Sequence, residues 1–469
     1  MSDGTGSMRH SDQTRPGSWQ LQEWLVVTPG LLAASCIAIL LAYAQKLPCS
    51  TGAWKTLRGS YSHLCYTDIH SLYFSEGLVK GTVPYLGHAV EYPVGIGMTM
   101  QVVASLVRGA GGPQSRAAAF YYLTAVLLAV FLAVTVFATA RLAGPERRRD
   151  ALLVALSPAV IFSAFTNWDL IAVGLAMVGL VAWAAGRPLV AGVLIGAATA
   201  TKFYPLLFFG PLLLLCWRAG RLRQFTVALA GGVASWLVMN LPFIVAAPSN
   251  WAWFYVFSRI RSASWGTIWL FFQQVHVPVA GTLHVGAQNL MSGGLFAACC
   301  IAIAVLAMAA PRPPRLPQLL FLVVAAFLLT GKVWSPQYVL WLAPLAVLAR
   351  PKLGAYLVWQ ACELAYWVAV KLALLHVYDL TGGLPAGKPG FAAIGMPWYY
   401  AALLARAASV LLFAVLVARD IMRPEGDVVR AAGADDPAGG VLAGAPDAAG
   451  LRLGSALPVR LRSKTVVHG

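Results

Sequence analysis

Residues 61–93 read YSHLCYTDIHSLYFSEGLVKGTVPYLGHAVEYP, a polar and aromatic stretch inside an otherwise apolar chain. The stretch carries Asp68, Glu76 and Glu91, which are three of only 17 acidic residues among 469. Carboxylates beside a membrane are costly to desolvate, so their presence needs an explanation. The stretch therefore indicates a functional site, and the apolar remainder indicates the scaffold that surrounds it.

The composition of the chain sets the class of protein. Apolar residues make up 59% of the chain and charged residues only 11%, whereas soluble domains carry about 25% charged residues. No soluble core can bury so much apolar surface, so the sequence predicts an all-α polytopic membrane protein. The net charge is +17, but the basic residues stand in short clusters between apolar segments, as the positive-inside rule describes. The charge therefore does not indicate a nucleic-acid partner.

The first apolar runs define the topology. Residues 24–45 are long enough to cross a bilayer. Their Ala42–Ala44 ending resembles a signal-peptide cleavage site, but the run is longer than a signal core, so we expect an uncleaved helix. The run over 94–107 is short for a span and is expected to lie at the membrane surface or re-enter. Residues 46–116 then form one large extracytoplasmic loop, and Arg147–Arg149 fall on the cytoplasmic side.

The later spans alternate consistently with this start. About twelve spans are expected, the others over roughly 117–142, 151–166, 170–185, 189–202, 204–217, 224–246, 287–310, 316–331, 338–350, 354–375 and 397–419. Residues 23–420 would form one transmembrane domain. Residues 1–22 are polar, and residues 421–469 are rich in Ala, Gly and Pro with scattered charges, so both tails are predicted to be cytoplasmic and disordered.

Two side-chain pairs are predicted. Cys49 and Cys65 flank a polar loop on the extracytoplasmic side, where disulfides persist, so we favour a bridge over two free thiols. Glu363 and Arg406 fall near mid-depth on the last two helices, where an unpaired charge is costly, so we expect them to pair.

The unusual polar residues gather on one predicted face. The links on the cytoplasmic side carry simple basic stops, whereas the other links carry polar and aromatic motifs. Those residues are Asp68, Glu91, Arg116, Asn167, Asp169, Lys202, Arg259, Arg261, Lys332, Gln337 and Tyr338. The predicted functional face is therefore extracytoplasmic.

A family resemblance is carried by five segments. They are CYTDIHSLYFSEGLVKGTVPY (65–85), EYPV (91–94), NWDLIAVGLAM (167–177), ATKFYPLLFF (200–209) and SPQYVLWLAPL (335–345). In this order they resemble glycosyltransferase family 87 of the GT-C superfamily, in particular the actinobacterial polyprenyl-phosphate-mannose-dependent mannosyltransferases. The resemblance covers about residues 25–420.

The resemblance implies a GT-C-like bundle and an inverting reaction. Mannose would move from polyprenyl-phosphate-mannose to a lipid or glycan acceptor among the membrane lipids and envelope glycans, giving an α-mannoside. The acidic base of the superfamily, in the first external loop, corresponds to Asp68, and an Arg at the entry to the second span corresponds to Arg116. The nearest relatives elongate phosphatidylinositol mannosides, but the resemblance does not define the acceptor of this chain.

These residue types suit that chemistry. A carboxylate that takes the proton of an attacking sugar hydroxyl typically accelerates the reaction by about 10²–10⁴-fold. A lipid phosphate leaves without a general acid, so one carboxylate is enough, unlike in glycoside hydrolases. Cations would stabilise the departing phosphate, and the candidates are Arg116, Lys202, Arg259 and Arg261. No His and carboxylate cluster stands at ligand spacing, so neither a metal nor a cofactor is predicted.

Alternative roles stay open for several of these residues. Glu91 is the main alternative general base. Asp169 alternatively caps the following helix, and Lys202 alternatively snorkels to the lipid headgroups. Arg259 and Arg261 alternatively anchor headgroups together with neighbouring tryptophans. Gln337 and Tyr338 are further candidates for substrate binding.

Two other classes of function were weighed. A transporter or flippase of a lipid-linked sugar would favour repeated halves with broken helices at corresponding positions, and no such repeat is visible. A non-catalytic scaffold is the third class, and the clustering of a carboxylate with cations argues against it.

Overall fold

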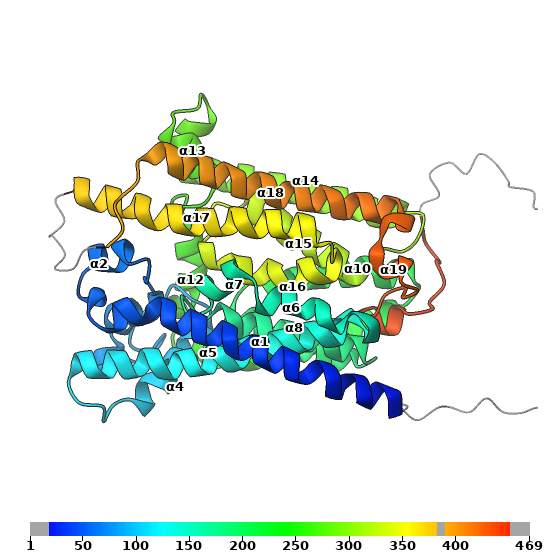
Figure 1. The fold of residues 1–469 in the computed structure, drawn as a ribbon, viewed down its shortest axis with the longest axis horizontal. Coiled ribbons are helices and arrows are strands. Elements are labelled where there is room, and N and C mark those ends of the chain that lie inside the picture. Colours follow the sequence, from blue (N-terminus) through cyan, green and yellow to red (C-terminus); the bar gives the residue numbers. More distant parts are fainter. Residues whose placement is uncertain (1–17, 382–389, 451–469) are drawn as a thin grey trace, which may run out of the picture.

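The computed structural model describes residues 18–381 and 390–450, and within these ranges the protein is helical without a β-strand. Six helices are long and apolar enough to cross a membrane. They are α1 (Ser18–Ser50), α5 (Pro113–Ala143), α11 (Leu222–Ala246), α14 (Val285–Ala309), α17 (Leu353–Leu380) and α18 (Met396–Met422). They run along the long axis of the molecule (Figure 1). The predicted all-α polytopic membrane protein is confirmed.

The outer surface of the long helices suits a lipid environment. Leu40 on α1, Val238 on α11 and Leu290 on α14 are 64%, 75% and 80% exposed. Side chains of this kind are not left in water across whole helices, whereas lipid tails solvate them at no cost.

Shorter apolar helices fill the interior between the long ones. They are α8 (Asp169–Ala184), α9 (Pro188–Thr201), α10 (Phe209–Arg218), α15 (Leu316–Thr330) and α16 (Val339–Ala349). Every residue of α16 is buried, although eleven residues rise only about 16 Å along a helix. Short helices and their irregular ends are tolerated at membrane depth because surrounding protein satisfies their backbone groups.

One expected span is broken. Residues 151–166, predicted as one helix, form α6 (Leu152–Ala155) and α7 (Pro158–Ser163). Pro158 lacks the N–H that a continuous helix needs, and Ser157 accepts a hydrogen bond from the Val160 N–H and so starts the second helix. The prediction of one continuous helix here is wrong.

The packing of α9 on α11 depends on glycine. A Cβ atom at Gly192 would lie 1.8 Å from the Ala228 carbonyl oxygen, and one at Gly196 would lie 2.2 Å from that of Gly232. Only glycine allows backbones to approach this closely, which is a common way for helices to pack in membranes.

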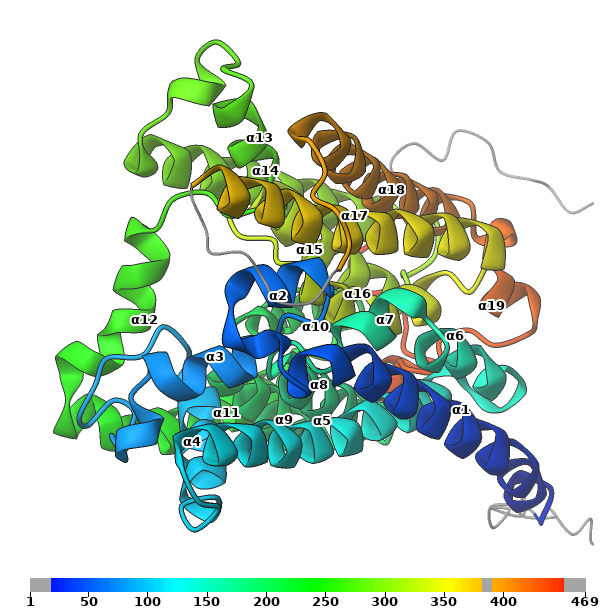
Figure 2. The same ribbon diagram turned by 60° about the vertical axis from the view of Figure 1, so that its left-hand side comes forward.

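The first loop begins later than expected, because α1 continues through Pro48 to Ser50. The loop holds α2 (Leu57–Ser62), α3 (Asp68–Ser75), η2 (Leu78–Lys80) and the 13-residue α4 (Val94–Leu106). Figure 2 shows α12 (Pro248–Ile260) crossing this same end of the bundle between α11 and α13 (Ile268–Gln274).

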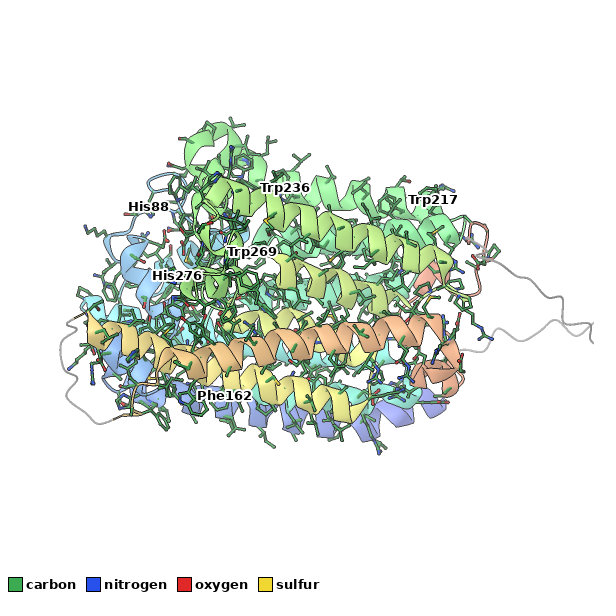
Figure 3. All side chains as sticks on the ribbon, turned by 90° about the horizontal axis from the view of Figure 1, so that it is seen from above. His88, Phe162, Trp217, Trp236, Trp269 and His276 are labelled. Atoms are coloured by element: carbon green, nitrogen blue, oxygen red, sulfur yellow. A yellow bond between two sulfur atoms is a disulfide. The ribbon has the colours of Figure 1, made fainter. Side chains whose placement is uncertain are left out.

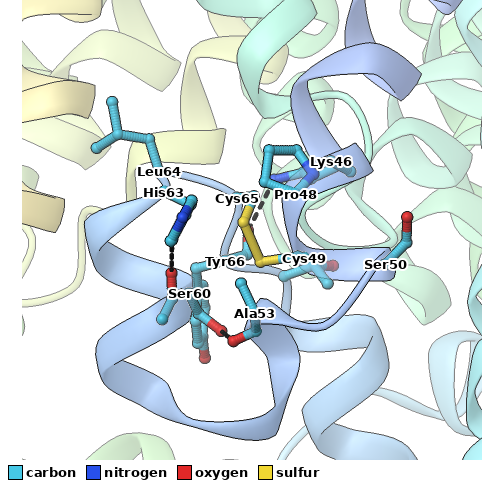
Figure 4. The surroundings of a disulfide bond; sticks show 12 residues. Lys46, Pro48, Cys49, Ser50, Ala53, Ser60, His63, Leu64, Cys65 and Tyr66 are labelled. Carbon is cyan, nitrogen blue, oxygen red and sulfur yellow. Dashed lines mark hydrogen bonds between the residues drawn. A yellow bond between two sulfur atoms is a disulfide. The ribbon is translucent and has the colours of Figure 1, made fainter. Parts of the chain in front are cut away.

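A disulfide joins the loop to α1. Cys49 and Cys65 are bonded, with a Cα–Cα distance of 5.6 Å (Figure 4), so the predicted bridge is confirmed. Beside it, the Gln45 amide donates to the Leu64 carbonyl, and the Lys46 ammonium donates to the Tyr66 carbonyl at 2.7 Å. These contacts fix the segment that leads into Asp68.

The second predicted pair is also present. The Arg406 Nε lies 2.8 Å from the Glu363 Oε2, and both side chains are buried between α18 and α17. The pairing predicted from their depth is confirmed.

The opposite end of the bundle carries a packed C-terminal segment (Figure 1). Residues 421–450, predicted to be disordered, include η7 (Pro424–Gly426), α19 (Val428–Ala431) and η8 (Gly440–Leu442). The segment cannot form a core of its own, but it folds against the bundle through ion pairs. The prediction of disorder is therefore wrong for residues 421–450, while residues 451–469 lie outside the described residues.

The ion pairs use arginines that, in the sequence, resemble the basic residues that commonly follow a membrane span. Arg315 pairs with Asp427 at 2.7 Å and Arg218 with Asp447 at 2.6 Å. The Trp183 Nε1 also donates to the Gly439 carbonyl at 3.0 Å. At the N-terminus, α1 already begins at Ser18, so residues 18–22 are helical, and residues 1–17 are outside the described part.

Candidate active site

A polar cavity of about 550 Å³ lies at the end of the bundle that carries the first loop. Figure 3 separates this end, marked by His88, from the end marked by Trp217. Its lining comes from segments far apart in the sequence: α3, the loop before α4, the ends of α9 and α12, and the turn between α15 and α16. The polar residues that line it include Asp68, Glu91, Asn167, Lys202, Arg261, Lys332 and Gln337.

Asp68 is held by both its backbone and its side chain. Thr67 caps α3 and donates its hydroxyl to the Phe165 carbonyl at 2.9 Å, while the Asp68 N–H donates to the Thr166 carbonyl at 2.9 Å. Asp68 is thus the first residue of α3, where the helix dipole favours a negative charge. The Asn167 Nδ2 donates to the Asp68 Oδ2 at 2.8 Å and to the Tyr92 hydroxyl at 2.9 Å.

Three cations line the same cavity. The Lys202 ammonium follows the end of α9 and lies 4.8 Å from the centre of the Tyr92 ring. The Lys332 ammonium donates to the carbonyls of Arg259 and Arg261 at 3.0 and 2.9 Å, which fixes the turn that presents Arg261. Burial and the neighbouring Arg261 charge lower the pKa of Lys332.

Glu91 is the second carboxylate of the cavity. Burial raises its pKa above the usual range, and the charge of Asp68 adds to this, while Arg261 and Lys202 oppose it. Burial also raises the pKa of Tyr92, and the charges of Asp68 and Glu91 act in the same direction. The two carboxylates therefore disfavour each other's charge across one cavity.

Six of the predicted site residues meet here. Asp68, Glu91, Lys202, Arg261, Gln337 and Tyr338 all line the cavity. Their convergence supports the sequence reasoning, because they come from five separate stretches of the chain.

Asp169 lies beneath the cavity instead of in it. It is fully buried, its Oδ1 accepts a hydrogen bond from the Trp341 Nε1 at 2.8 Å, and it lies 3.5 Å from the Lys202 ammonium. Trp341 is stacked against Tyr204 and Tyr338, with ring centroids 4.3 and 3.7 Å away. Asp169 therefore lies behind Lys202 and does not line the cavity. Its side chain does not cap α8, whose N-cap is Trp168 without a side-chain bond.

Arg116 and Arg259 are outside the cavity. Arg116 is in the first turn of α5, which packs against α1, α3 and α8. Arg259 is exposed. Lys332 contacts the backbone carbonyl oxygen of Arg259 and not its guanidinium. The expectation that these two arginines contact substrate finds no support in their position, because neither side chain lines the cavity.

Several lining residues were not among the predicted site residues. Asn167 stands in the same motif as Asp169, and the motif alone does not say which of the two side chains reaches the cavity. Lys332 was noted for its position but not assigned to the site. Tyr92 and Tyr255 look like ordinary interfacial aromatics in the sequence.

An apolar cavity of about 700 Å³ adjoins the polar one. It lies among α9, the segment before α10, α11 and α12, and its lining includes Leu206, Leu229, Val233, Trp236 and Leu237. Phe203 and Tyr255 line both cavities, so the two share a wall.

The described residues bring no three His, Cys, Asp or Glu side chains together at metal-ligand distance. The polar side of the site thus consists of carboxylates, amides, ammonium and guanidinium groups and aromatic rings.

An all-helical membrane bundle with a carboxylate and several cations in one polar cavity defines a membrane enzyme that handles a charged substrate. A family model for glycosyltransferase family 87 matches residues 92–336, just over half of the chain, and the chain belongs to this family. The resemblance carried by the five sequence segments is thereby confirmed, and the protein is a membrane glycosyltransferase.

Comparison with solved structures finds distant similarity. The apo-state crystal structure of ArnT from Cupriavidus metallidurans shares 16% sequence identity at a TM-score of 0.41, over 85% of this chain and 78% of that one. The apo oligosaccharyltransferase of Archaeoglobus fulgidus shares 15% identity at a TM-score of 0.38, over 87% of this chain and 57% of that one. No curated protein matches the sequence.

Proposed function

We propose that the protein is an inverting α-mannosyltransferase that moves mannose from polyprenyl-phosphate-mannose to a lipid or glycan acceptor, with Asp68 as the general base. The observation that carries the proposal is that Asp68 lines one cavity with Lys202, Arg261 and Lys332. A single carboxylate facing a group of cations suits a reaction with a hydroxyl nucleophile and a phosphate leaving group.

The reaction follows from these groups. The acceptor hydroxyl gives its proton to Asp68 while its oxygen bonds to the anomeric carbon on the face opposite the phosphate. The bond from the anomeric carbon to the phosphate oxygen breaks, and the electron pair stays on the phosphate. Lys202, Arg261 and Lys332 stabilise that growing charge. Attack from the opposite face turns a β-linked donor into an α-linked product.

The adjoining apolar cavity supports a lipid-linked donor. A sugar phosphate in the polar cavity leaves its lipid chain to pass Phe203 and Tyr255, beyond which the lining is almost wholly apolar. Burying isoprenoid carbon there contributes roughly 25 cal/mol per Å² removed from water.

Basic residues support an extracytoplasmic position for the cavity, with both termini cytoplasmic. Arg147, Arg218, Arg315 and Arg350 all lie in links between apolar helices that end away from α2 and α3. The positive-inside rule assigns that end to the cytoplasm. The Cys49–Cys65 bridge at the other end agrees, because disulfides persist outside the cytoplasm.

The test uses membranes that contain the full-length protein, labelled polyprenyl-phosphate-mannose and a phosphatidylinositol mannoside mixture as the acceptor pool. We expect labelled product lipid from the wild type. Asp68→Asn should lower the rate by at least about 10²-fold, with donor binding retained. Asp379→Asn, at the exposed surface of the same end, is the matched control and should be unaffected.

Two outcomes would overturn parts of the proposal. Transfer from polyprenyl-phosphate-glucose but not from the mannose donor would exclude mannose as the sugar. Equal transfer by Asp68→Asn and the wild type would exclude Asp68 as the base.

A further inference from the structure

Two buried lysines close to Asp68 have no part in the reaction as described. Lys46 lies near the end of α1 and Lys371 within α17, and they are only 1% and 4% exposed. Neither lines the polar cavity. A lysine in an apolar membrane helix is costly, and such residues usually serve a function with an identifiable partner.

Lys46 hydrogen-bonds to the two chain segments that hold Asp68. Its ammonium donates to the Tyr66 carbonyl at 2.7 Å and to the Thr166 hydroxyl at 3.4 Å. Thr166 is also the residue whose carbonyl accepts the Asp68 N–H. Lys46 therefore joins the segment that contains Tyr66 to the segment that contains Thr166, and both segments hold the Asp68 carboxylate in place.

Lys371 reaches the same place from another helix. Its ammonium lies 4.7 Å from the centre of the Tyr66 ring and 5.4 Å from that of Trp367. The Lys46 ammonium lies 5.9 Å from the same Trp367 ring. Two lysine side chains thus share one site beside the Trp367 ring.

Both lysines reach Asp68 through Tyr66. Lys46 donates to the Tyr66 carbonyl and Lys371 lies over the Tyr66 ring, while the Tyr66 side chain hydrogen-bonds the Asp68 carboxylate. The charge of Asp68 and burial raise the pKa of Tyr66, so the phenol stays protonated and donates.

The other charged groups around Asp68 belong to the cavity itself. Glu91 is a second carboxylate there, and Lys202, Arg261 and Lys332 are the cations that line it. Burial raises the pKa values of Tyr61 and Tyr92, so these phenols are uncharged near neutral pH. Lys46 and Lys371 differ from the cavity cations because they lie outside the cavity and contact the residues that hold Asp68.

We propose that Lys46 and Lys371 are positioning residues that hold Asp68, through Tyr66 and Thr166, toward the polar cavity. The inference rests on the proposed function of Asp68 as the base. Without either lysine, the contacts of Tyr66 and Thr166 loosen, and the carboxylate leaves the position from which it takes the acceptor proton.

The test measures transfer by the full-length protein in phosphatidylcholine vesicles, with the donor and acceptor pool named above. Lys46→Met, Lys371→Met, Lys46→Arg and Lys371→Arg are compared with the exposed Lys80→Met as control. The readouts are kcat, the donor KM and the midpoint of thermal unfolding.

Each Met variant should lose about tenfold in kcat, with the donor KM within about twofold, because the base is misplaced while the cations that line the cavity are untouched. The Arg variants keep the charge and should retain most of the activity. Lys80→Met should match the wild type.

Failure of this inference is distinguishable from failure of the proposed function. If the wild type transfers no mannose, the proposed function is wrong. If the wild type transfers and Asp68→Asn does not, but the Met variants keep the wild-type kcat, the inference alone is wrong. A loss of kcat with a lowered unfolding temperature and no rescue by Arg would also overturn it.

Discussion

Arg406 offers the clearest test of how the buried part of the bundle is stabilised. We expect Arg406→Met to lower the free energy of unfolding by about 3–5 kcal/mol, the cost of removing one partner of a buried pair. The guanidinium is fully buried and lies 2.8 Å from the Glu363 carboxylate. Its loss leaves that carboxylate buried without a counter-charge.

The other Arg406 contacts extend the effect to the cavity. The guanidinium donates to the carbonyls of Trp334 and Ser335 at 3.1 Å each and stacks 4.1 Å from the Trp334 ring. Ser335 lines the polar cavity, as does Lys332 in the same turn. Arg406→Met should therefore also reduce transfer, although Arg406 does not line the cavity.

A double-mutant cycle separates the pair from simple packing. Glu363→Leu alone should also destabilise, because the arginine then lacks its counter-ion. The double variant Arg406→Met, Glu363→Leu should cost much less than the sum of the single changes, since two apolar side chains leave no buried charge. Reversible unfolding in mixed micelles with increasing sodium dodecyl sulfate measures each value.

The matched control is the exposed pair of Arg58 and Asp379, whose side chains are 30% and 36% exposed. Exposed pairs contribute about 0–1 kcal/mol, so Arg58→Met should change stability by less than that. If Arg406→Met costs no more than Arg58→Met, or if the two changes at 406 and 363 add fully, the buried pair does not have the assigned role.

Three further predictions follow from the described contacts. Cys65→Ser should destabilise the protein by about 3 kcal/mol, because the bridge to Cys49 closes a loop of 16 residues; equal unfolding curves with and without reductant would contradict this. Because burial raises the pKa of Glu91, the group is protonated at higher pH than an exposed glutamate and then opposes the donor phosphate less. The donor KM should thus rise as pH rises through that pKa, and Glu91→Gln should abolish the rise; a Gln variant that keeps it would exclude Glu91. Asp427→Asn should destabilise by about 3–5 kcal/mol through Arg315, measured by the same micelle titration, and a change below 1 kcal/mol would show that the C-terminal segment is only loosely held.

Apolar patterning predicts much of this fold. The expected spans coincide with the apolar helices except over residues 151–166, where Pro158 starts a second helix. Patterning cannot tell a helix that faces lipid from one enclosed by protein, because both are apolar on every side. The enclosure of α15 and α16 by surrounding helices is therefore visible only in the three-dimensional packing.

The polar pairs show where sequence reasoning stops. Glu363 and Arg406 are predictable because each is the unusual charge on an apolar helix. Lys46 is not, because a lysine at the end of a span usually reaches the headgroups. The fold of residues 421–450 is not predictable from composition, because it depends on Arg218 and Arg315 far back in the chain.

Within the site, neither residue type nor position in a motif decides which side chains line the cavity. Asp68 and Lys202 line the cavity as expected, whereas Asp169, in an equally suggestive motif, is enclosed behind Lys202. Asn167 and Asp169 are two residues apart, and the first side chain reaches the cavity while the second is enclosed in the bundle. Such directions follow from tertiary packing and are not encoded in the spacing.

The ion pairs of the C-terminal segment join residues that are synthesised far apart in time. Arg218 is made 229 residues before Asp447, a delay of roughly 10–50 s at ribosomal rates of 5–20 residues per second. A product cut short by a premature stop before Asp427 would leave the Arg315 guanidinium enclosed without its counter-ion. The last part of the chain to be synthesised is therefore needed to neutralise a charge buried among helices made much earlier.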